Sequence, residues 1–292
     1  MGKLYVVSTP IGNLKDITLR AIEVLTEVDF IACEDTRETR KLLTRYGITT
    51  RCLSYHEHNK EKRTPQILKR LHSGEECALV SDRGTPAISD PGFFLVRAAI
   101  DKGIEVIPIP GSSAILASLV VSGLPTDRFI FVGFLPKKKG QRRVLLTDVK
   151  GVRATLILYV SPRILPDAVR EMIDVLGDRR GAIVREVTKM NEEVLRGKLS
   201  ELARVISERG KVLLGEFVLL IEGARRQEGE DAWEADLLLE ALYKPPPATL
   251  KEGVSWLVGR SGLRRNRAYE TVKRFLKGPA GEGKDSESTS GG

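Results

Sequence analysis

Three short polar stretches, CEDTR, YHEHN and REVTK, carry side chains that could move a proton. They supply Glu34, Asp35, Arg37, His56, Glu57, His58, Asn59, Glu186 and Lys189. Carboxylates, imidazoles and amines can accept a proton from a hydroxyl group or polarise it. Asp35 has a second interpretation, because it precedes a helical pattern that begins at Thr36 and could cap that helix. His56 and His58 could bind a metal ion, but no third ligand is evident, so we expect no metal site.

Five turns rich in glycine, proline and polar side chains follow apolar stretches. They are STPIGN, CEDTR, SYHEHN, SDRGTP and PIPGSSA, at residues 8–13, 33–37, 54–59, 81–86 and 108–114. Each turn alone could be an ordinary connection, since these residues are common turn formers and helix caps. The sequence has no G-x-G-x-x-G after the first strand and no Walker A motif, which argues against dinucleotide and triphosphate loops. We favour a ligand site built from backbone groups and hydroxyls at one edge of a sheet.

Apolar runs alternate with helical patterns along the chain. The expected strands are residues 4–8, 29–33, 51–55, 77–81 and 104–109, and the expected helices are residues 17–28, 36–47 and 62–74. The pattern continues with a helix at 112–123 and strands near 128–134, 154–160, 181–187 and 212–223. Such alternation is typical of the α/β class, with mostly parallel sheets covered on both faces.

Composition shifts divide the chain into five parts. We predict an N-terminal α/β domain (1–111), a C-terminal α/β domain (112–223), a linker and helix (224–246), a small basic helical domain (247–277) and a disordered tail (278–292). Thr249 and Glu252 form a capping-box pattern at the start of the helical domain. Its two amphipathic segments join around residues 261–263, which fits a helix-turn-helix shape.

The chain is basic, with 47 Lys and Arg against 39 Asp and Glu and a formal net charge of +8. Cations gather in KKKGQRR and in the C-terminal helical segment. The candidate phosphate-binding residues are Lys137, Lys138, Lys139, Arg142, Arg143, Arg264, Arg265 and Arg267. A solvated helix surface would also be rich in cations. Because we expect these segments to lie close to the ligand site, we interpret them as a surface that binds the phosphates of a nucleic acid.

Composition also points to a soluble protein in a reducing compartment. Hydrophobic residues make up 41% of the chain, and no apolar run approaches the roughly 18 residues that a membrane helix needs. Cys33, Cys52 and Cys77 lack metal-site spacing, so we expect buried free thiols. The N-terminus has no signal-peptide pattern, and we therefore expect a cytoplasmic protein without membrane association.

Several stretches together resemble one known family. In chain order they are LYVVSTPIGNLKDITLRA, CEDTRETRKLL, YHEHN, VSDRGTPAISDPG, PIPGSSA, FVGFLPKKKGQR, YVSPRI and REVTKMNEEVLRG. They run from Leu4 to Gly197, and the resemblance continues to Gly223. The ordered set is similar to the tetrapyrrole (corrin/porphyrin) methylase family, and within it to a branch that methylates ribosomal RNA and carries a small helical C-terminal domain.

The resemblance implies two α/β domains that flank a cleft holding S-adenosylmethionine in a folded conformation. The cofactor-binding residues that it implies are Pro10, Gly12, Gly84, Thr85, Pro86, Ser89, Gly111, Ser112, Ser113, Phe134 and Leu135. Among the polar candidates we favour Glu34 and Lys189 as catalytic residues. Arg83 departs from the family, whose members usually carry a small residue there. Because a cation beside a sulfonium is unfavourable, we expect its side chain to point away or to meet RNA phosphate.

The resemblance also implies an activity, namely 2′-O-methylation of the ribose of a cytidine in 16S ribosomal RNA, in the decoding region of the small subunit. It further implies a homodimer with the second α/β domain at or near the interface, and we interpret the C-terminal helices as an RNA-docking module. Two alternatives stay open. One is a tetrapyrrole (corrin precursor) methyltransferase, and the other is a helix-turn-helix nucleic-acid-binding regulator with a vestigial α/β body.

Overall fold

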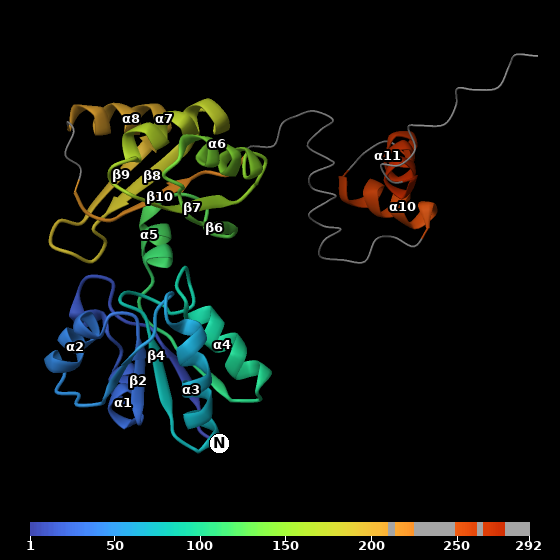
Figure 1. Cartoon of the computed structure of the whole chain (residues 1–292). Coiled ribbons are helices and arrows are strands. Elements are labelled where there is room, and N and C mark those ends of the chain that lie inside the picture. The colour runs from blue at the N-terminus through green and yellow to red at the C-terminus, as the bar shows by residue number, and fades with distance from the viewer. Residues whose placement is uncertain (210–213, 225–248, 262–264, 278–292) are drawn as a thin grey trace, which may run out of the picture. The chain divides into compact units, whose positions relative to one another are not determined.

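A computed structural model describes residues 1–209, 214–224, 249–261 and 265–277 of the chain. The chain divides into two compact units, residues 1–225 and 226–292, and each is described by itself (Figure 1). The first unit contains two five-stranded sheets. We call the part built on the first sheet the first lobe and the part built on the second sheet the second lobe.

The first sheet is parallel throughout, with strand order β3-β2-β4-β1-β5. Its strands are β1 (Leu4–Val7), β2 (Phe30–Cys33), β3 (Cys52–Ser54), β4 (Cys77–Val80) and β5 (Val106–Ile109). The connections contain η1 (Leu14–Asp16), α1 (Leu19–Glu27), α2 (Thr36–Arg45), α3 (Lys60–His72) and α4 (Gly92–Asp101). The strand and helix periodicity of the sequence predicted this sheet and the helices α1, α2 and α3.

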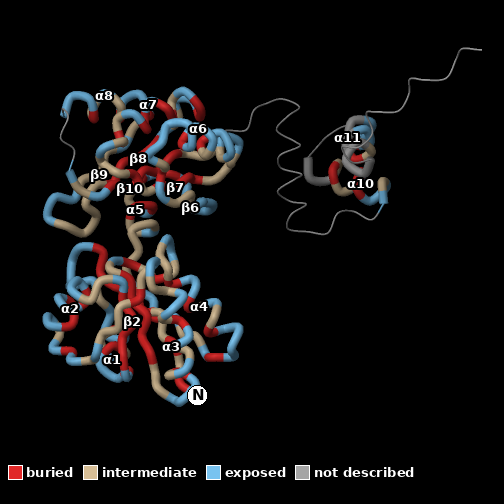
Figure 2. The backbone as a smooth tube through the Cα atoms, viewed as in Figure 1, coloured by how far each residue is buried: buried red, intermediate tan, exposed pale blue. Residues whose placement is uncertain are grey.

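Alternate strand residues of the first sheet face two separate cores. Leu4, Phe30 and Leu79 pack with residues of α3 and α4, while Ile31 and Ala78 pack with residues of α1 and α2. All four residues of β2 and all four of β4 are buried, as the red tube in the centre of the lobe shows (Figure 2). Helices therefore cover both faces, and the loops at the carboxyl ends of the strands remain available for a ligand.

The second sheet has the order β6-β7-β10-β8-β9 and is mixed. Its strands are β6 (Phe129–Phe134), β7 (Thr155–Val160), β8 (Arg180–Arg185), β9 (Glu193–Lys198) and β10 (Phe217–Ile221). Only β6 and β7 pair in parallel; β10 is antiparallel to β7 and β8, and β9 is antiparallel to β8. The prediction of a mostly parallel sheet is wrong here, because a short loop joins β8 directly to β9 without a crossover helix.

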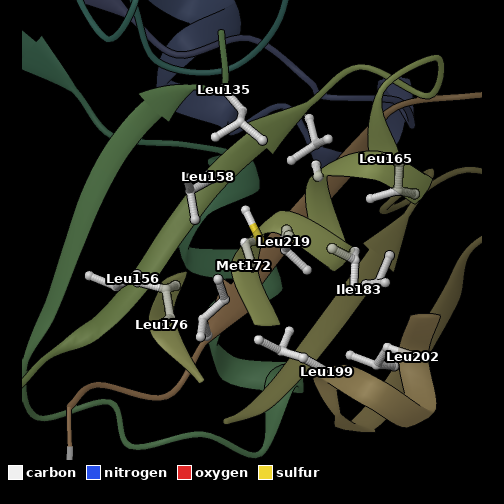
Figure 3. Close-up of a cluster of buried hydrophobic side chains, with 14 of the residues drawn as sticks. Leu135, Leu156, Leu158, Leu165, Met172, Leu176, Ile183, Leu199, Leu202 and Leu219 are labelled. Atoms are coloured by element: carbon white, nitrogen blue, oxygen red, sulfur yellow. The ribbon is translucent and has the colours of Figure 1, made fainter. Parts of the chain in front are cut away.

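Helices also cover both faces of the second sheet. One core packs β-strand residues such as Leu158, Ile183 and Leu219 against α6 (Lys139–Asp148), α7 (Leu165–Leu176) and α8 (Leu199–Glu208) (Figure 3). The other core packs Leu119 of α5 (Ala114–Ser122) against the opposite face (Figure 1). Because α5 follows directly on the turn after β5, the chain passes from the first lobe to the second at residues 110–113.

Arg142 in α6 is not available to RNA, which corrects its assignment as a phosphate-binding residue. Its side chain is buried, with the residue 4% exposed. The guanidinium donates to the Glu171 carboxylate at 2.8 and 2.6 Å and to the Lys137 carbonyl oxygen at 2.7 Å. This ion pair ties α6 to α7 and lowers the pKa of Glu171. The neighbouring cations Lys137, Lys138, Lys139 and Arg143 are exposed.

The second unit contains α10 (Leu250–Ser261) and α11 (Arg265–Lys277), which pack through Val254, Leu257, Ala268 and Val272. The Thr249 hydroxyl accepts a hydrogen bond from the Glu252 amide at 3.3 Å, which is one half of the predicted capping box. Arg265 is exposed. Arg264, the Arg267 side chain, the predicted linker at 225–246 and the predicted tail at 278–292 lie outside the described residues.

Two expectations from composition can be compared with the structure. Within the described residues, no helix is long and apolar enough to cross a membrane. Cys33, Cys52 and Cys77 are free thiols; Cys33 and Cys77 are buried, and Cys52 is half-buried. The expected burial of the thiols is therefore confirmed for two of the three.

The buried ion pair predicts a stability effect of the Arg142→Met substitution. Since this change leaves the Glu171 carboxylate buried without its cation, we expect the free energy of unfolding at neutral pH to fall by about 3–5 kcal/mol in urea denaturation. Arg142 lowers the pKa of Glu171, so the pair stabilises the fold above the usual glutamate pKa. The difference between wild type and variant should shrink as the pH falls through the lowered pKa of the folded state. The control is Arg143→Met, an exposed neighbour with an expected effect within about 0.5 kcal/mol. Equal losses at the two positions would contradict this account.

Candidate active site

A cavity of about 1080 Å³ opens in the first unit, and both lobes line it. The first lobe contributes the carboxyl ends of β1, β4 and β5 with the turns that follow them. The second lobe contributes residues of α5, β6, β7 and β10. The lining includes Ser8, Ile11, Glu34, Asp82, Arg83, Gly84, Thr85, Ser89, Asp90, Gly111, Ser113, Leu116, Phe131, Phe134, Tyr159, Glu216 and Phe217. The cavity thus lies at the edge of the first sheet where the turn pattern predicted a ligand site.

Backbone pairing beyond the sheet holds the SDRGTP turn in place. The Thr9 amide donates to the Gly84 carbonyl oxygen at 2.9 Å, and the Gly84 amide donates back at 3.1 Å. The Ser8 and Thr85 hydroxyls lie 3.0 Å apart. Gly84 has a φ of 81°, in the left-handed region that favours glycine. These contacts fix the turn after β1 against the turn after β4. The two turns together form one wall of the cavity.

The turn after β5 approaches the end of β1 closely. A Cβ atom on Gly111 would lie 2.9 Å from the Ser8 Cβ atom, closer than real Cβ contacts allow. The Ser112 hydroxyl donates to the Asp16 carbonyl oxygen at 3.2 Å. Ser113 is the N-cap residue of α5 and has extended backbone, with no side-chain capping bond. Glycine at position 111 thus lets the chain pass against β1 on its way to the second lobe.

The structure separates the predicted cofactor-binding residues into two groups. Gly84, Thr85, Ser89, Gly111, Ser113 and Phe134 line the cavity. Pro10, Gly12, Pro86 and Ser112 are not among the lining residues. Leu135 needs correction as a wall residue, because its side chain is 4% exposed and packs in the core of the second lobe (Figure 3). The strand alternates here, so Phe134 and Leu135 point in opposite directions.

Sequence analysis included Phe134 but missed Phe131 and Tyr159 of the apolar wall and four of the lining acids, Glu38, Asp82, Asp90 and Glu216. Phe131, Tyr159 and Phe134 form a row of rings, with centroid separations of 4.9 and 5.0 Å and edge-to-face geometry. In the sequence these residues read as strand interior, and only the pairing of β6 with β7 brings them together. Asp82 and Asp90 stand within the recognised stretch VSDRGTPAISDPG, where their position at a strand-end turn was the available signal.

The cavity is acidic. Among its described lining residues, Glu34, Glu38, Asp82, Asp90 and Glu216 carry carboxylates and Arg83 carries the one cation. Glu38 pairs with Lys41, and Glu216 pairs with Arg83 and Lys189. Glu34, Asp82 and Asp90 have no ion pair with any described residue. Uncompensated carboxylates that face one cavity favour a positively charged ligand.

Glu34 titrates in this acidic environment. Partial burial raises the pKa of its carboxyl group, and the nearby charges of Asp82 and Asp90 raise it further. Burial also raises the pKa of Asp90, although its carboxylate accepts hydrogen bonds from the Ala87 and Gly92 amides. A carboxylate with a raised pKa is a better proton acceptor than an ordinary one, and a bound cation would offset its charge.

Asp35 serves as the N-cap of α2, which was its alternative interpretation. Its carboxylate accepts from the Arg37 amide at 2.8 Å and pairs with the Arg37 guanidinium at 2.7 Å. The side-chain and backbone hydrogen bonds from Arg37 lower the pKa of Asp35 to about 2. Neither residue lines the cavity. Their interaction organises the start of the helix, which also places Glu34 immediately before it.

The YHEHN stretch forms a local network that does not reach the cavity lining. The Asn59 side chain accepts from the His56 amide at 2.9 Å and donates to the Ser54 carbonyl oxygen at 3.2 Å. Glu57 pairs with Lys60 at 2.5 Å. The His56 and His58 rings lie 6.0 Å apart, and the described residues contain no cluster suited to a metal ion. This stretch organises the β3–α3 connection.

Lys189 is engaged in an ionic network rather than free in the cavity. Its ammonium lies 2.9 Å from a Glu186 oxygen and 3.1 Å from a Glu216 oxygen. Burial alone would raise the pKa of Glu186, but hydrogen bonds from Lys189 and from the Glu216 amide outweigh it and lower that pKa. Arg83 lines the cavity, where its guanidinium pairs with Glu216. The geometry gives Lys189 a positioning role.

Comparisons with known proteins agree with this architecture. The family described as Tetrapyrrole (Corrin/Porphyrin) Methylases matches residues 3–203. A protein of Halalkalibacterium halodurans named ribosomal RNA small subunit methyltransferase I is 51% identical over 233 residues, 80% of each chain. A protein of the same name from Mesorhizobium japonicum is 46% identical over 281 residues, covering 96% of this chain and 94% of the relative.

Solved structures share the fold at much lower identity. Diphthine synthase superposes with a TM-score of 0.60 at 17% identity, covering 76% of this chain and 90% of that one. Uroporphyrin-III C-methyl transferase from Thermus thermophilus, complexed with S-adenyl homocysteine, superposes with a TM-score of 0.51 at 20% identity, covering 75% and 97%. These likenesses concern the fold. With the family match and the identities above, the chain belongs to the tetrapyrrole (corrin/porphyrin) methylase family, in the group whose curated members are named ribosomal RNA small subunit methyltransferase I.

Proposed function

We propose that this chain transfers a methyl group from S-adenosylmethionine to the ribose 2′-hydroxyl of a cytidine in 16S ribosomal RNA, in the decoding region of the small subunit. The curated relatives carry the name of a small-subunit ribosomal RNA methyltransferase. The cytidine and the 2′-oxygen come from the family resemblance. The observation that carries the proposal is the cavity between the lobes, which Glu34, Asp82 and Asp90 line without an ion pair to any residue in the described part of the chain.

The residues of the cavity fit S-adenosylmethionine. The cofactor has a sulfonium and an ammonium group, which suit an acidic pocket, and an adenine ring, which suits the apolar wall of Phe131, Phe134 and Tyr159. When bound, it supplies an electrophilic methyl group. Gly84, Thr85, Ser89, Gly111 and Ser113 would hold it through backbone groups and hydroxyls. Arg83 does not oppose this charge, because Glu216 neutralises its guanidinium.

Methyl transfer depends chiefly on alignment of donor and acceptor and on exclusion of water. The two lobes provide alignment and exclude water, because the acceptor must enter a cavity that residues of both lobes line. A ribose hydroxyl is a weak acid, so a proton acceptor helps. Glu34 is the candidate base, since it lines the cavity and has a raised pKa. Lys189 would act by fixing Glu186 and Glu216.

Outside the cavity, exposed cations suit an RNA backbone. Lys137, Lys138, Lys139 and Arg143 are exposed at the start of α6, directly after the cavity residue Phe134. Arg265 adds an exposed cation in the second unit. Contacts to phosphate position an RNA without reading its sequence. This arrangement supports a ribosomal RNA substrate and, with it, a cytoplasmic location.

The second lobe also offers a surface for a homodimer. Val120 of α5 is 73% exposed and Ile130 of the edge strand β6 is 41% exposed, and neither lines the cavity. Large exposed apolar side chains outside a ligand cavity are a feature of protein interfaces. We include a homodimer through this face in the proposal.

Filling the cavity tests the cofactor assignment. The Ser113→Trp substitution places an indole at a lining position with extended backbone and no capping bond to lose. We expect S-adenosylmethionine binding, measured by calorimetry, to be lost while the melting temperature of the unliganded protein stays within a few degrees. Ser113→Ala is the matched control and should bind. The decisive assay is transfer of labelled methyl from the wild type to small subunits that lack the modification. Transfer to a corrin precursor instead, or binding of duplex DNA without S-adenosylmethionine, would overturn the proposal.

The raised pKa of Glu34 predicts a pH profile. If Glu34 accepts the proton, its carboxylate form is the active one, so kcat/KM for S-adenosylmethionine, which reports the free enzyme, should decline as the pH falls through a pKa above the usual glutamate value. Glu34→Gln should lower the rate by about 10²- to 10⁴-fold and remove this acidic limb. Glu38→Gln changes the same charge at another lining position and should retain the limb. An unchanged rate in Glu34→Gln would exclude Glu34 as the base.

The apolar face predicts a change of oligomeric state. The Val120→Asp substitution places a charge at the most exposed apolar position of α5, so we expect the dimer to dissociate more readily in sedimentation velocity. Ile100→Asp, at a similarly exposed apolar position on α4, is the control and should leave the dimer intact. A wild type that sediments as a monomer would refute the dimer and leave the activity proposal standing.

A further inference from the structure

One chain of charged side chains connects the two lobes beside the cavity. Arg83, in the turn after β4 of the first lobe, pairs with Glu216 at the start of β10 in the second lobe. Glu216 also pairs with Lys189, at 3.1 Å, and Lys189 pairs with Glu186, at 2.9 Å. Both Arg83 and Glu216 line the cavity. We call these four residues the ionic latch.

Both ends of the latch start from constrained backbone. On the first lobe, the Ser81 hydroxyl donates to the Arg83 and Gly84 carbonyl oxygens at 3.3 and 3.2 Å, and the Thr9–Gly84 backbone pair holds the same turn. On the second lobe, the Glu216 amide donates to the Glu186 carboxylate at 2.8 Å, and its carbonyl oxygen accepts from the Glu186 amide at 2.9 Å. An ion pair between pre-positioned groups loses less conformational entropy than one between free side chains.

A second contact brings the lobes together at the other end of the latch. Gly12 belongs to the turn after β1, and a Cβ atom there would lie 2.5 Å from the Lys189 Cγ atom and 2.9 Å from the Thr188 Oγ1 atom. Thr188 and Glu186 both adopt positive φ, at 68° and 50°, which L residues rarely do. The strained loop therefore places the Lys189 stem against a glycine that alone leaves room for it. This packing explains why glycine is needed at position 12, although Gly12 does not line the cavity.

We propose that the ionic latch holds the two lobes together over the bound donor and thereby slows exchange of S-adenosylmethionine and its product S-adenosylhomocysteine. The proposal rests on the function proposed above. Residues of both lobes line the cavity, so a bound ligand can leave more easily when the two lobes move apart. The covalent connection at residues 110–113 restrains one part of the cavity, and the latch is the ionic crossing between the lobes within the described residues. Arg83, which departs from the family pattern, is then a positioning residue rather than an obstacle to a cationic ligand.

The latch lies partly in water, which sets the size of its effect. The side chains of Arg83 and Glu216 are 50% and 59% exposed, while those of Lys189 and Glu186 are 19% and 18% exposed. Exposed ion pairs are weak and are screened by salt, although networks with fixed geometry are stronger. Loss of the outer pair should therefore speed ligand release about two- to fivefold.

The test is the dissociation rate of tritiated S-adenosylhomocysteine from the full-length protein, chased with unlabelled ligand. Arg83→Ala and Glu216→Gln should each raise the rate by that factor, and the double variant should be no faster than either single variant. Raising the salt concentration should speed release from the wild type more than from Arg83→Ala, in which only the attraction between the ligand and the cavity carboxylates is left to screen. Arg97→Ala removes an equal charge from an exposed position on α4 and should behave as the wild type. Unchanged rates in both single variants, or fully additive effects, would overturn the latch.

A measurement without ligand separates this inference from the proposed function. In the unliganded protein, Arg83→Ala and Glu216→Gln should lower the melting temperature by amounts that do not add in the double variant. Additive shifts there would show that the two side chains do not interact and would overturn the latch. A wild type that binds no S-adenosyl ligand but shows the non-additive shift would refute the proposed cofactor and leave the ionic connection between the lobes established.

Discussion

The paired backbone hydrogen bonds between Thr9 and Gly84 are the contact on which the geometry of the site depends. They form an antiparallel bridge beyond the last residues of the parallel strands β1 and β4, so two turns that would otherwise move independently form one surface. Gly84 makes this possible, because its φ of 81° turns the chain back toward Thr9. Thr85 and Arg83, on either side, then have fixed starting points, one for a hydroxyl facing the cavity and one for a guanidinium facing the other lobe.

Charge segregation reconciles two demands that a single surface could not meet. A cationic donor needs an acidic pocket, whereas an RNA acceptor needs a basic approach. The chain has a net charge of +8, yet Glu34, Asp82 and Asp90 line the cavity and form no ion pair with a described residue. The exposed lysines begin three residues after the lining residue Phe134, so acidic lining residues and basic surface residues are separated by a short stretch of chain. Arg142 does not contribute to the basic surface, because it is buried in an ion pair with Glu171 that joins α6 to α7.

Local sequence patterns predicted the first lobe well because its elements carry clear local signals, although the pairing of its strands is long-range. Each strand is a short apolar run, the turns that follow are rich in polar residues, glycine or proline, and a parallel sheet brings all the turns to one edge. The second lobe was less predictable. β9 reads EVLRGK, without an apolar alternation strong enough to mark a strand, and the reversal of β10 depends on pairing across the sheet. The Glu171 partner of Arg142 lies 29 residues away and the Glu216 partner of Lys189 lies 27 residues away, so no local pattern reveals these two pairs; the Glu186–Lys189 pair, by contrast, spans only three residues. Likewise, the pairing of β6 and β7, rather than any motif, assembles the aromatic wall.

The aromatic wall has a chemical consequence as well as a steric one. Tyr159 stands between Phe131 and Phe134, and burial raises the pKa of its phenol, with a further contribution from the charge of Glu216. The phenol therefore stays protonated throughout the physiological range. In a cavity lined by uncompensated carboxylates, it adds a hydrogen-bond donor without adding charge. An alkyl transfer needs no covalent intermediate, so groups of this kind, which orient a ligand and exclude water, can contribute as much as a proton acceptor does. The reacting groups would then meet where a rigid turn from one lobe faces a row of rings from the other, and the chemistry would depend mainly on how firmly those two walls are held.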